Sequence, residues 1–201
     1  MKFVLASHNK NKLREMQEIL GALGVEVVLQ SELGLSIDVE ETGETFEENS
    51  YLKAKAVMEA TGLPAIADDS GLCVDVLGGA PGIYSARYGD EDYVTDQDRR
   101  LLLLKNMRGI RSEERTARFV CVITLLWPDG RKLVAKGFVE GLITFEPRGE
   151  DGFGYDPVFY VPAFGCTTAE MSDEQKNAIS HRGKAFVQLL PQIRAWLEQA
   201  K

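Results

Sequence analysis

The chain opens with a strand, a helix and a second strand, and this order constrains its fold more than any other feature of the sequence. The β-prone run KFVLA covers residues 2–6. Residues 9–20 then carry apolar side chains at helical spacing, and the run VEVV follows at 25–28. Such a β-α-β opening is typical of an α/β protein that contains a parallel sheet.

The later segments predict a mixed sheet. Two long β-prone runs, at 117–127 and 131–145, flank the turn PDG and predict a hairpin. A shorter strand is expected for AIAD at 65–68, ending at two adjacent aspartates. Helices are expected from Thr45 to about Ala60, over residues 94–107, and from Ser180 to about Ala200; Thr45 and Glu48 have capping-box spacing. The sequence therefore predicts an α/β fold with a mixed, twisted sheet flanked by helices.

Length and composition favour one globular domain that covers residues 1–201. A chain of 201 residues can bury a substantial core, and no linker-like segment divides it. No apolar run approaches the roughly 18 residues needed to span a bilayer, and the N-terminus lacks the pattern of a secretory signal. Three widely spaced cysteines without metal-ligand spacing are expected to be reduced thiols. We therefore expect a cytoplasmic protein with no membrane partner.

The formal net charge of −8 disfavours nucleic acid as a partner, because such binding depends on many contacts from Lys and Arg to phosphates. A small anionic ligand stays compatible with this charge, since a local basic cluster is sufficient to bind it. One such cluster includes Lys10 and Lys12, and another includes His181 and Arg182.

The first basic cluster lies where a strand ends and a helix begins, in the stretch SHNKNK at 7–12. Such a junction presents backbone N–H groups and the positive end of a helix dipole to an anion. A cation there is unfavourable by about 0.3–1 kcal/mol without a ligand, and a bound polyphosphate would reverse that sign. Lys10 and Lys12 therefore either bind phosphate groups or point into solvent.

A second candidate lies on the helix that follows Thr45. At the helical period, Asn49 and Lys53 fall within the apolar face, whereas Lys55 falls on the opposite face. A lysine on an inward face is costly unless it finds an anion or its ammonium group reaches water. A bound anion would satisfy both Asn49 and Lys53, whereas a lysine that reaches solvent would need none.

Acidic residues occur as two adjacent pairs, Glu40–Glu41 and Asp68–Asp69. Oxygen ligands at scattered positions suit Mg²⁺, which usually takes one or two carboxylates together with substrate phosphates. Adjacent residues on a strand point to opposite faces, so one of Asp68 and Asp69 is expected to face the site and the other to be structural. The spacing leaves open which is which, and Glu40 and Glu41 taken alone are typical of surface carboxylates.

Two further segments carry side chains that suit a nucleobase. In GEDGFGYDP, glycines flank Phe153 and Tyr155, and a ring in such a loop either stacks on a base or packs in the core. Lys176, His181 and Arg182 crowd the entry to the last helix. Together with the basic and acidic segments, these residues indicate a nucleotide site. No serine or cysteine has a plausible histidine base, so water activated by metal and carboxylate is the expected nucleophile.

Five segments resemble the inosine triphosphate pyrophosphatase family, and most closely its bacterial dITP/XTP pyrophosphatases. They are SHNKNK, EETGETFEENSYLKA, ADDSGLCVDVLGGAPGIYSARY, GFGYDPVF and EQKNAISHRGKA, and the resemblance runs from Phe3 to the last helix. It implies a long mixed sheet with two lobes and an active-site cleft between them. It also implies a homodimeric, Mg²⁺-dependent enzyme. Water would attack the α-phosphorus of dITP, ITP, XTP or dXTP, releasing the monophosphate and pyrophosphate and removing deaminated purines from the nucleotide pool.

The resemblance also assigns roles to individual residues. Asp69 matches the proton acceptor, and Glu40 and Asp69 match the metal carboxylates, which leaves Asp68 to support the turn. The substrate contacts that the resemblance implies are Ser7, His8, Asn9, Lys10, Asn11, Lys12, Asn49, Lys53, Ser70, Phe153, Gly154, Tyr155, Asp156, Lys176, His181 and Arg182.

Two other functions stay open beside this one. The first is a pyrophosphatase for other unusual nucleotides, such as modified pyrimidines, which a panel of substrates would distinguish. The second is a sensor that binds a nucleotide without turning it over, and the unbroken set of acidic residues argues against it.

Overall fold

The structure is a computed structural model that describes residues 2–89 and 91–199. Its strands are β1 (Lys2–Leu5), β2 (Glu26–Leu29), β3 (Ala65–Val74), β4 (Thr116–Leu126), β5 (Lys132–Ile143), β6 (Phe159–Val161) and β7 (Cys166–Thr167). Its α-helices are α1 (Lys10–Gly21), α2 (Phe46–Thr61), α3 (Asp96–Asn106), α4 (Asp173–Ile179) and α5 (His181–Gln199). The expected β-α-β opening and the expected long helices are therefore present.

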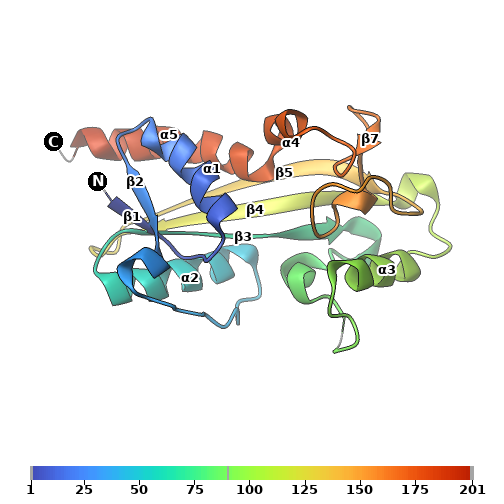
Figure 1. Cartoon of the computed structure of the whole chain (residues 1–201), viewed down its shortest axis with the longest axis horizontal. Coiled ribbons are helices and arrows are strands. Elements are labelled where there is room, and N and C mark those ends of the chain that lie inside the picture. The colour runs from blue at the N-terminus through green and yellow to red at the C-terminus, as the bar shows by residue number, and fades with distance from the viewer. Residues whose placement is uncertain (1, 90, 200–201) are drawn as a thin grey trace. The chain divides into compact units, whose positions relative to one another are not determined.

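The described strands form one mixed sheet in the order β2-β1-β3-β4-β5-β6-β7 (Figure 1). β1 pairs in parallel with β2, as the β-α-β opening predicts, and it also pairs in parallel with β3. β6 pairs antiparallel with both β5 and β7. β4 and β5 are neighbours, and the tight turn between them is closed by the N–H of Gly130, which donates to the carbonyl of Trp127 at 2.9 Å. The predicted fold class, α/β with a mixed sheet flanked by helices, is confirmed.

The chain divides into two compact units, which are described one at a time. Among the described residues, the first unit comprises 2–69, 121–137 and 184–199, and the second comprises 70–89, 91–120 and 138–183. β3, β4 and β5 each contribute residues to both units. Within the described ranges, no helix is both long and apolar enough to cross a membrane.

In the first unit, helices cover both faces of the strands (Figure 1). α1 and α5 pack on one face, where Met16 and Phe186 join a buried cluster with Phe3. α2 packs on the other face, where Val57 joins Val4. Phe3 and Val4 are neighbours on β1, so they point to opposite faces. All five side chains are at most 1% exposed, and burying each contributes about 1.5–3 kcal/mol.

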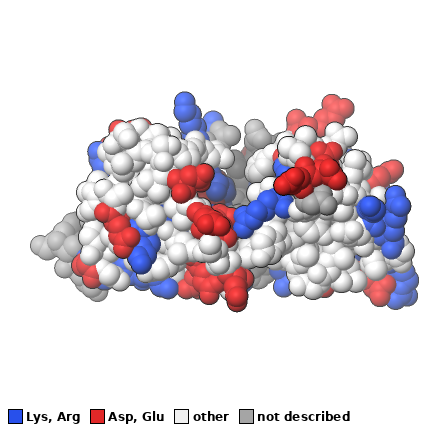
Figure 2. Space-filling model, turned by 90° about the horizontal axis from the view of Figure 1, so that it is seen from below, with Lys and Arg blue, Asp and Glu red and all other residues white. Residues whose placement is uncertain are grey.

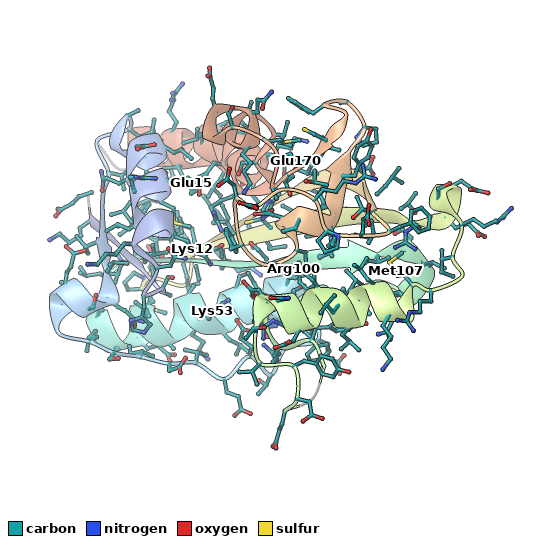
Figure 3. The ribbon with its side chains drawn as sticks, turned by 45° about the vertical axis from the view of Figure 1, so that its right-hand side comes forward. Lys12, Glu15, Lys53, Arg100, Met107 and Glu170 are labelled. Carbon is teal, nitrogen blue, oxygen red and sulfur yellow. The ribbon has the colours of Figure 1, made fainter. Side chains whose placement is uncertain are left out.

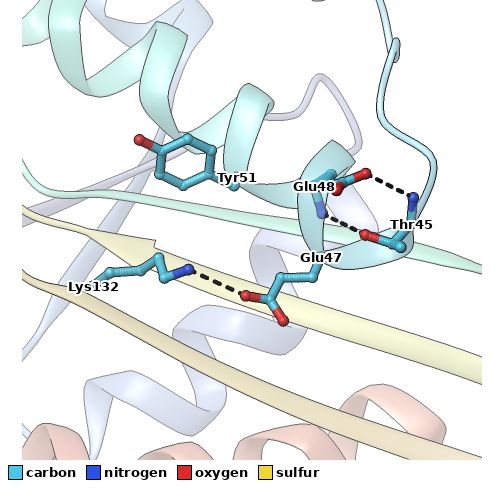
Figure 4. Close-up of a pocket in the computed structure, with 5 residues that line it drawn as sticks. All are labelled: Thr45, Glu47, Glu48, Tyr51 and Lys132. Carbon is cyan, nitrogen blue, oxygen red and sulfur yellow. Dashed lines mark hydrogen bonds and ion pairs between the residues drawn. The ribbon is translucent and has the colours of Figure 1, made fainter.

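The start of α2 is fixed by the capping box that the sequence predicts (Figure 4). Thr45 Oγ1 accepts a hydrogen bond from the N–H of Glu48 at 3.1 Å, and Glu48 Oε2 accepts one from the N–H of Thr45 at 3.1 Å. Beside this cap, Lys132 Nζ lies 3.1 Å from Glu47 Oε1. The cap sets where the helix begins, and this places Asn49 and Lys53 one and two turns farther along.

β3 continues through the two aspartates, so the expectation that it ends there is wrong. Leu72 and Val74 are fully buried in the second unit, and this core holds the second half of the strand in an extended conformation. The side chains of β3 alternate as those of a strand should: Ile66 faces the core beneath α1 and α5, and Ala67 faces the core beneath α2.

In the second unit, Leu103 of α3 and Met107, the residue that follows α3, share a buried cluster with Val139 of β5. Arg115 is only 2% exposed and ties the end of α3 to the end of β5. Its guanidinium donates to the carbonyls of Met107, Ile110, Ile143 and Thr144. Desolvation of this buried cation lowers the pKa of Arg115.

Acidic and basic side chains are intermixed on the face of the molecule shown in Figure 2. The formal net charge of −8 is therefore the sum of many charged side chains of both signs, which lie close to one another on this face. Ion pairs of the first unit include Lys12 with Asp68 and Lys53 with both Asp69 and Glu41. These pairs belong to the candidate site.

Candidate functional site

The loop between β1 and α1 is shaped by its own side chains. The N–H of Asn9 donates to Ser7 Oγ at 3.1 Å, and the N–H of Lys12 donates to Asn9 Oδ1 at 3.3 Å. Asn9 thus caps α1, a structural role that sequence reasoning did not give it. His8 accepts a hydrogen bond at Nε2 from the side-chain amide of Gln30 at 3.1 Å. Lys10 is exposed, and the side chain of Asn11, a predicted substrate contact, lies outside the described part of the structure.

Lys12 is held by Asp68. The ammonium nitrogen of Lys12 lies 2.8 Å from Asp68 Oδ1, and the two side chains are 25% and 1% exposed. Of the two possibilities for the lysines at this junction, pointing into solvent is therefore wrong for Lys12. Its charge faces a buried carboxylate, at the start of a helix where a cation is otherwise unfavourable.

Asp69 meets Lys53 from the other side of β3. Lys53 Nζ lies 2.8 Å from Asp69 Oδ1 and 2.7 Å from Glu41 Oε1. Figure 3 shows Lys12 on α1 and Lys53 on α2, and these helices cover opposite faces of the first unit. The expectation that neighbouring aspartates point to opposite faces is confirmed: Asp68 pairs with α1 and Asp69 with α2.

Burial changes the pKa values of both members of the Lys53–Asp69 pair. Burial raises the pKa of Asp69 above its ordinary value, and the charge of Lys53 offsets only part of that effect. Burial alone would lower the pKa of Lys53, but the attraction of Asp69 and Glu41 outweighs it and raises that pKa. Lys53 therefore stays charged at neutral pH, and Asp69 holds a proton more readily than an exposed aspartate does.

Two polar atoms in this cluster are buried without a hydrogen-bond partner among the described residues. They are Asp69 Oδ2 and Asn49 Nδ2, neither of which meets the distance and angle of a hydrogen bond. The Asn49 amide still lies near enough to the Asp69 carboxylate to lower its pKa, against the larger effect of burial. The other end of the Asn49 amide is satisfied, because Oδ1 accepts from the N–H of Gly43 at 2.8 Å. A buried carboxylate oxygen without a partner is costly. A cation or a water molecule bound at Asp69 Oδ2 would remove that cost.

Glu40 and Glu41 differ in their surroundings. Glu40 is exposed, whereas Glu41 is half-buried and bonded to Lys53. The family resemblance matches Glu40 to a metal carboxylate and assigns no role to Glu41. The spacing of the pair gave no signal that would separate them, because the loop before α2 has no regular period.

In the second unit, Asp156 organises the loop that carries Phe153. Asp156 Oδ2 accepts from Lys176 Nζ at 2.8 Å and from the N–H of Phe153 at 3.0 Å, and Oδ1 accepts from Thr168 at 2.9 Å. Gly152 has a φ of +84°, and a Cβ there would collide with the Asp156 carboxylate and lie 2.6 Å from Lys176 Nζ. The glycine therefore lets the ion pair close against the backbone.

The remaining predicted residues of the second unit have mixed environments. Tyr155 is buried, its hydroxyl donates to the carbonyl of Ser85 at 2.9 Å, and burial raises its pKa. His181 begins α5, and its ring stacks on Phe119 with centroids 5.5 Å apart. Arg182 and Ser70 are both half-buried. Thus the buried Tyr155 ring packs in the core, whereas Phe153 is 78% exposed.

The donor set of the first unit suits a hard divalent cation. Among the described residues, no three His, Cys, Asp or Glu side chains converge on one point. Mg²⁺ does not need such a cage, since it is commonly bound by one or two carboxylates, water and substrate phosphates. The unpartnered Asp69 Oδ2 fits a ligand of this kind. Carboxylates beside two lysines can together bind a metal and the phosphate groups that it contacts.

Comparisons with known proteins give one consistent result. The model of the Ham1 family matches residues 3–192. The chain is 52% identical to a dITP/XTP pyrophosphatase from Escherichia coli O157:H7, covering 96% of this chain and 98% of that one. It is 54% identical to a dITP/XTP pyrophosphatase from Thermus thermophilus, covering 94% and 90%. The solved structure of a HAM1 protein from Coxiella burnetii is similar at a TM-score of 0.89 and 45% identity, covering 96% and 98%.

Proposed function

Because the chain belongs to the Ham1 family, we propose that it hydrolyses dITP, ITP, XTP and dXTP to the nucleoside monophosphate and pyrophosphate. This membership agrees with the resemblance seen in the sequence. Relatives at about half identity over nearly their full length are dITP/XTP pyrophosphatases, and this supports the same substrates here. The whole chain, residues 1–201, would act as one pyrophosphatase domain.

The observation that carries the proposal is the arrangement around Asp69. Its Oδ1 is paired with Lys53 at 2.8 Å, and its Oδ2 is buried without a partner among the described residues. One oxygen is thus held by a cation, while the other, beside the Asn49 amide but without a hydrogen bond of good geometry, would be a ligand for a metal ion or a water molecule. In the proposed reaction Asp69 orients the attacking water and accepts its proton.

Asp69 and Glu40 are the residues that would hold Mg²⁺, and the bound ion would offset the negative charge of the phosphate oxygens. Lys12 and Lys53 would contribute to the same electrostatic stabilisation. Negative charge builds on the phosphate oxygens as water bonds to the α-phosphorus and the bond from that phosphorus to pyrophosphate breaks. The loop from Ser7 to Lys12 and the side chain of Asn49 would bind the triphosphate. Ser70 would contact the substrate next to Asp69.

The base would be recognised by residues of the second unit. Phe153 to Asp156 and Lys176 form one group, and His181 and Arg182 form another. Hypoxanthine and xanthine carry a 6-oxo acceptor, whereas adenine carries a 6-amino donor at the same edge. Donors from His181 or Arg182 would pair with the oxo group and would be left unpaired by adenine, which is a strong source of discrimination.

We further propose that the enzyme is a cytoplasmic homodimer that binds neither nucleic acid nor membrane. The family resemblance supports the dimer. The net charge of −8 supports the absence of nucleic acid. Free nucleoside triphosphates are cytoplasmic metabolites, which supports the location.

The test compares the wild-type protein with Asp69→Asn in ITP hydrolysis with and without Mg²⁺. Turnover should depend on the metal ion and should fall by about 10²–10⁴-fold in the variant, the range for loss of a general base. Wild-type turnover in Asp69→Asn would show that the assignment of Asp69 is wrong. Faster turnover of a UTP-like substrate than of ITP would instead indicate a pyrophosphatase for modified pyrimidines.

A further inference from the structure

The loop at Phe153 leaves its ring in solvent while its backbone is held. Phe153 is 78% exposed. Its N–H donates to Asp156 Oδ2 at 3.0 Å, and its carbonyl accepts from the N–H of Asp156 at 3.2 Å. A ring left in water forgoes the stabilisation that burial would give it. The closed turn therefore presents the ring instead of burying it.

Both backbone polar groups of the next residue are bonded to α3. The N–H of Gly154 donates to Asp96 Oδ2 at 2.9 Å, and the carbonyl of Gly154 accepts from the guanidinium of Arg100 at 2.7 Å. Asp96 and Arg100 are four residues apart, so they lie on one face of the helix. Gly154 has a φ of +58°, a conformation that disfavours any side chain. The two helix residues therefore bind the loop at a glycine whose backbone conformation other residues rarely adopt.

Asp96 is itself fixed within α3. Arg99 donates to Asp96 Oδ1 at 2.7 Å, which leaves Oδ2 for the N–H of Gly154. These two bonds, the one from Arg99 first, lower the pKa of Asp96. A capping box between Thr95 and Asp98 fixes the start of the helix. The carboxylate is thus charged and oriented before any ligand arrives.

We propose that Asp96 and Arg100 are positioning residues for base recognition, which hold the Gly154 backbone so that the Phe153 ring is presented for stacking on the purine. The inference rests on the proposed function, which assigns this loop to the base. Fixing the loop in advance reduces the conformational freedom that is lost when the substrate binds. Neither residue belongs to the set that the family resemblance assigns to the substrate.

The experiment uses the variants Asp96→Ala, Arg100→Met and Phe153→Ala, with Lys105→Met, at the exposed far end of α3, as the control. The KM and kcat for ITP are measured beside the inhibition constant of inorganic tripolyphosphate, which has no base. Asp96→Ala and Arg100→Met should raise the KM for ITP about five- to tenfold, as expected for a weakened base stack. The inhibition constant of tripolyphosphate should not change, and Lys105→Met should match the wild type.

A double variant separates positioning from a general loss of structure. Asp96 and Arg100 together are called the clamp. Arg100→Met combined with Phe153→Ala should have the KM of Phe153→Ala alone, because the clamp acts only through the Phe153 ring. An unchanged KM for ITP in Asp96→Ala and Arg100→Met would overturn the proposal. An equal rise in the inhibition constant of tripolyphosphate would overturn it too, and so would a double variant in which the two effects on KM add. If Arg100→Met does not fold, Arg100→Gln replaces it.

The proposed function can fail separately from this inference. If the wild-type protein does not hydrolyse ITP, the proposed function is wrong. Calorimetric binding of ITP and of tripolyphosphate to the same variants then tests the clamp. Weaker binding of ITP alone would support the clamp, and equal effects on both ligands, or no binding of ITP to the wild type, would reject it.

Discussion

Lys12 and Asp68 form a partly buried ion pair that joins α1 to β3, with 2.8 Å between the ammonium nitrogen of Lys12, which is 25% exposed, and Oδ1 of a carboxylate that is 1% exposed. The next residue along the strand, Asp69, pairs with Lys53 of α2 instead. Two adjacent aspartates thus bind two lysines on two helices. In our account Asp69 acts on the substrate, while Asp68 holds a lysine that does.

The ion pair predicts a large loss of stability when its cation is removed. Lys12→Met leaves the Asp68 carboxylate buried without this partner, which typically costs about 3–5 kcal/mol. The measurement is the free energy of unfolding from denaturant titration at neutral pH. Lys10→Met is the matched control, because Lys10 is an exposed lysine of the same helical turn and should change stability by about 0.5 kcal/mol or less. Equal effects of the two variants would contradict the assignment.

The two aspartates should differ in their effect on turnover. Asp68→Asn keeps a similar shape but weakens the hold on Lys12, so we expect turnover to fall about tenfold, as for loss of one charged contact. Asp69→Asn should cost far more, because it removes the proposed base. Steady-state kinetics on both folded variants make the comparison. A loss in Asp68→Asn that equals the loss in Asp69→Asn would show that this division of roles is false.

Removing Lys53 should destabilise the protein in a way that grows with pH. Lys53→Met removes the cation that partly offsets the burial of Asp69, so the pKa of Asp69 rises further in the folded state. A carboxyl whose pKa is raised on folding contributes stability below its unfolded pKa, and this is lost as pH rises through the folded pKa. The cost of Lys53→Met should therefore be smallest near pH 4 (about the unfolded pKa of aspartate) and largest near neutrality.

Unfolding titrations across this pH range test the prediction, and Lys55→Met provides the control. Lys55 lies on the same helix, where it makes a longer, exposed ion pair of 3.8 Å with Glu59. Such a surface pair contributes about 0–1 kcal/mol, so this variant should change little at any pH. A cost of Lys53→Met that stays constant or shrinks toward neutral pH would contradict the proposed environment of Asp69.

Much of the fold could be predicted because its signals are local and repetitive. The β-α-β opening, the hairpin around PDG and the capping box at Thr45 each depend on residues close together in the sequence. The end of β3 could not be predicted in this way. Gly71 and the preceding aspartates look like a turn, but the apolar residues beyond them are buried in the second unit and keep the chain extended.

The candidate site could be predicted only in part from the residues themselves. Strand alternation correctly separates Asp68 from Asp69, and the helical period correctly places Lys53 on an inward face. The identity of each partner depends on contacts between distant segments. Asp68 bonds to Lys12, which lies 56 residues away in the sequence, and Arg100 bonds to Gly154, which lies 54 residues away. No local pattern encodes such pairs, and this is why the roles of Asp68, Glu41 and Arg100 required the structure.

The proposed reaction is tested most directly by a product assay over a panel of nucleoside triphosphates, with pyrophosphate resolved from orthophosphate. With Mg²⁺ present, we expect pyrophosphate and the monophosphate from ITP, dITP and XTP, with slower turnover of ATP and UTP-like substrates. Release of orthophosphate would place the attack on a different phosphorus atom and would show that the proposed reaction is wrong. Binding of ITP without any product would contradict it as well, since that result would indicate a nucleotide sensor.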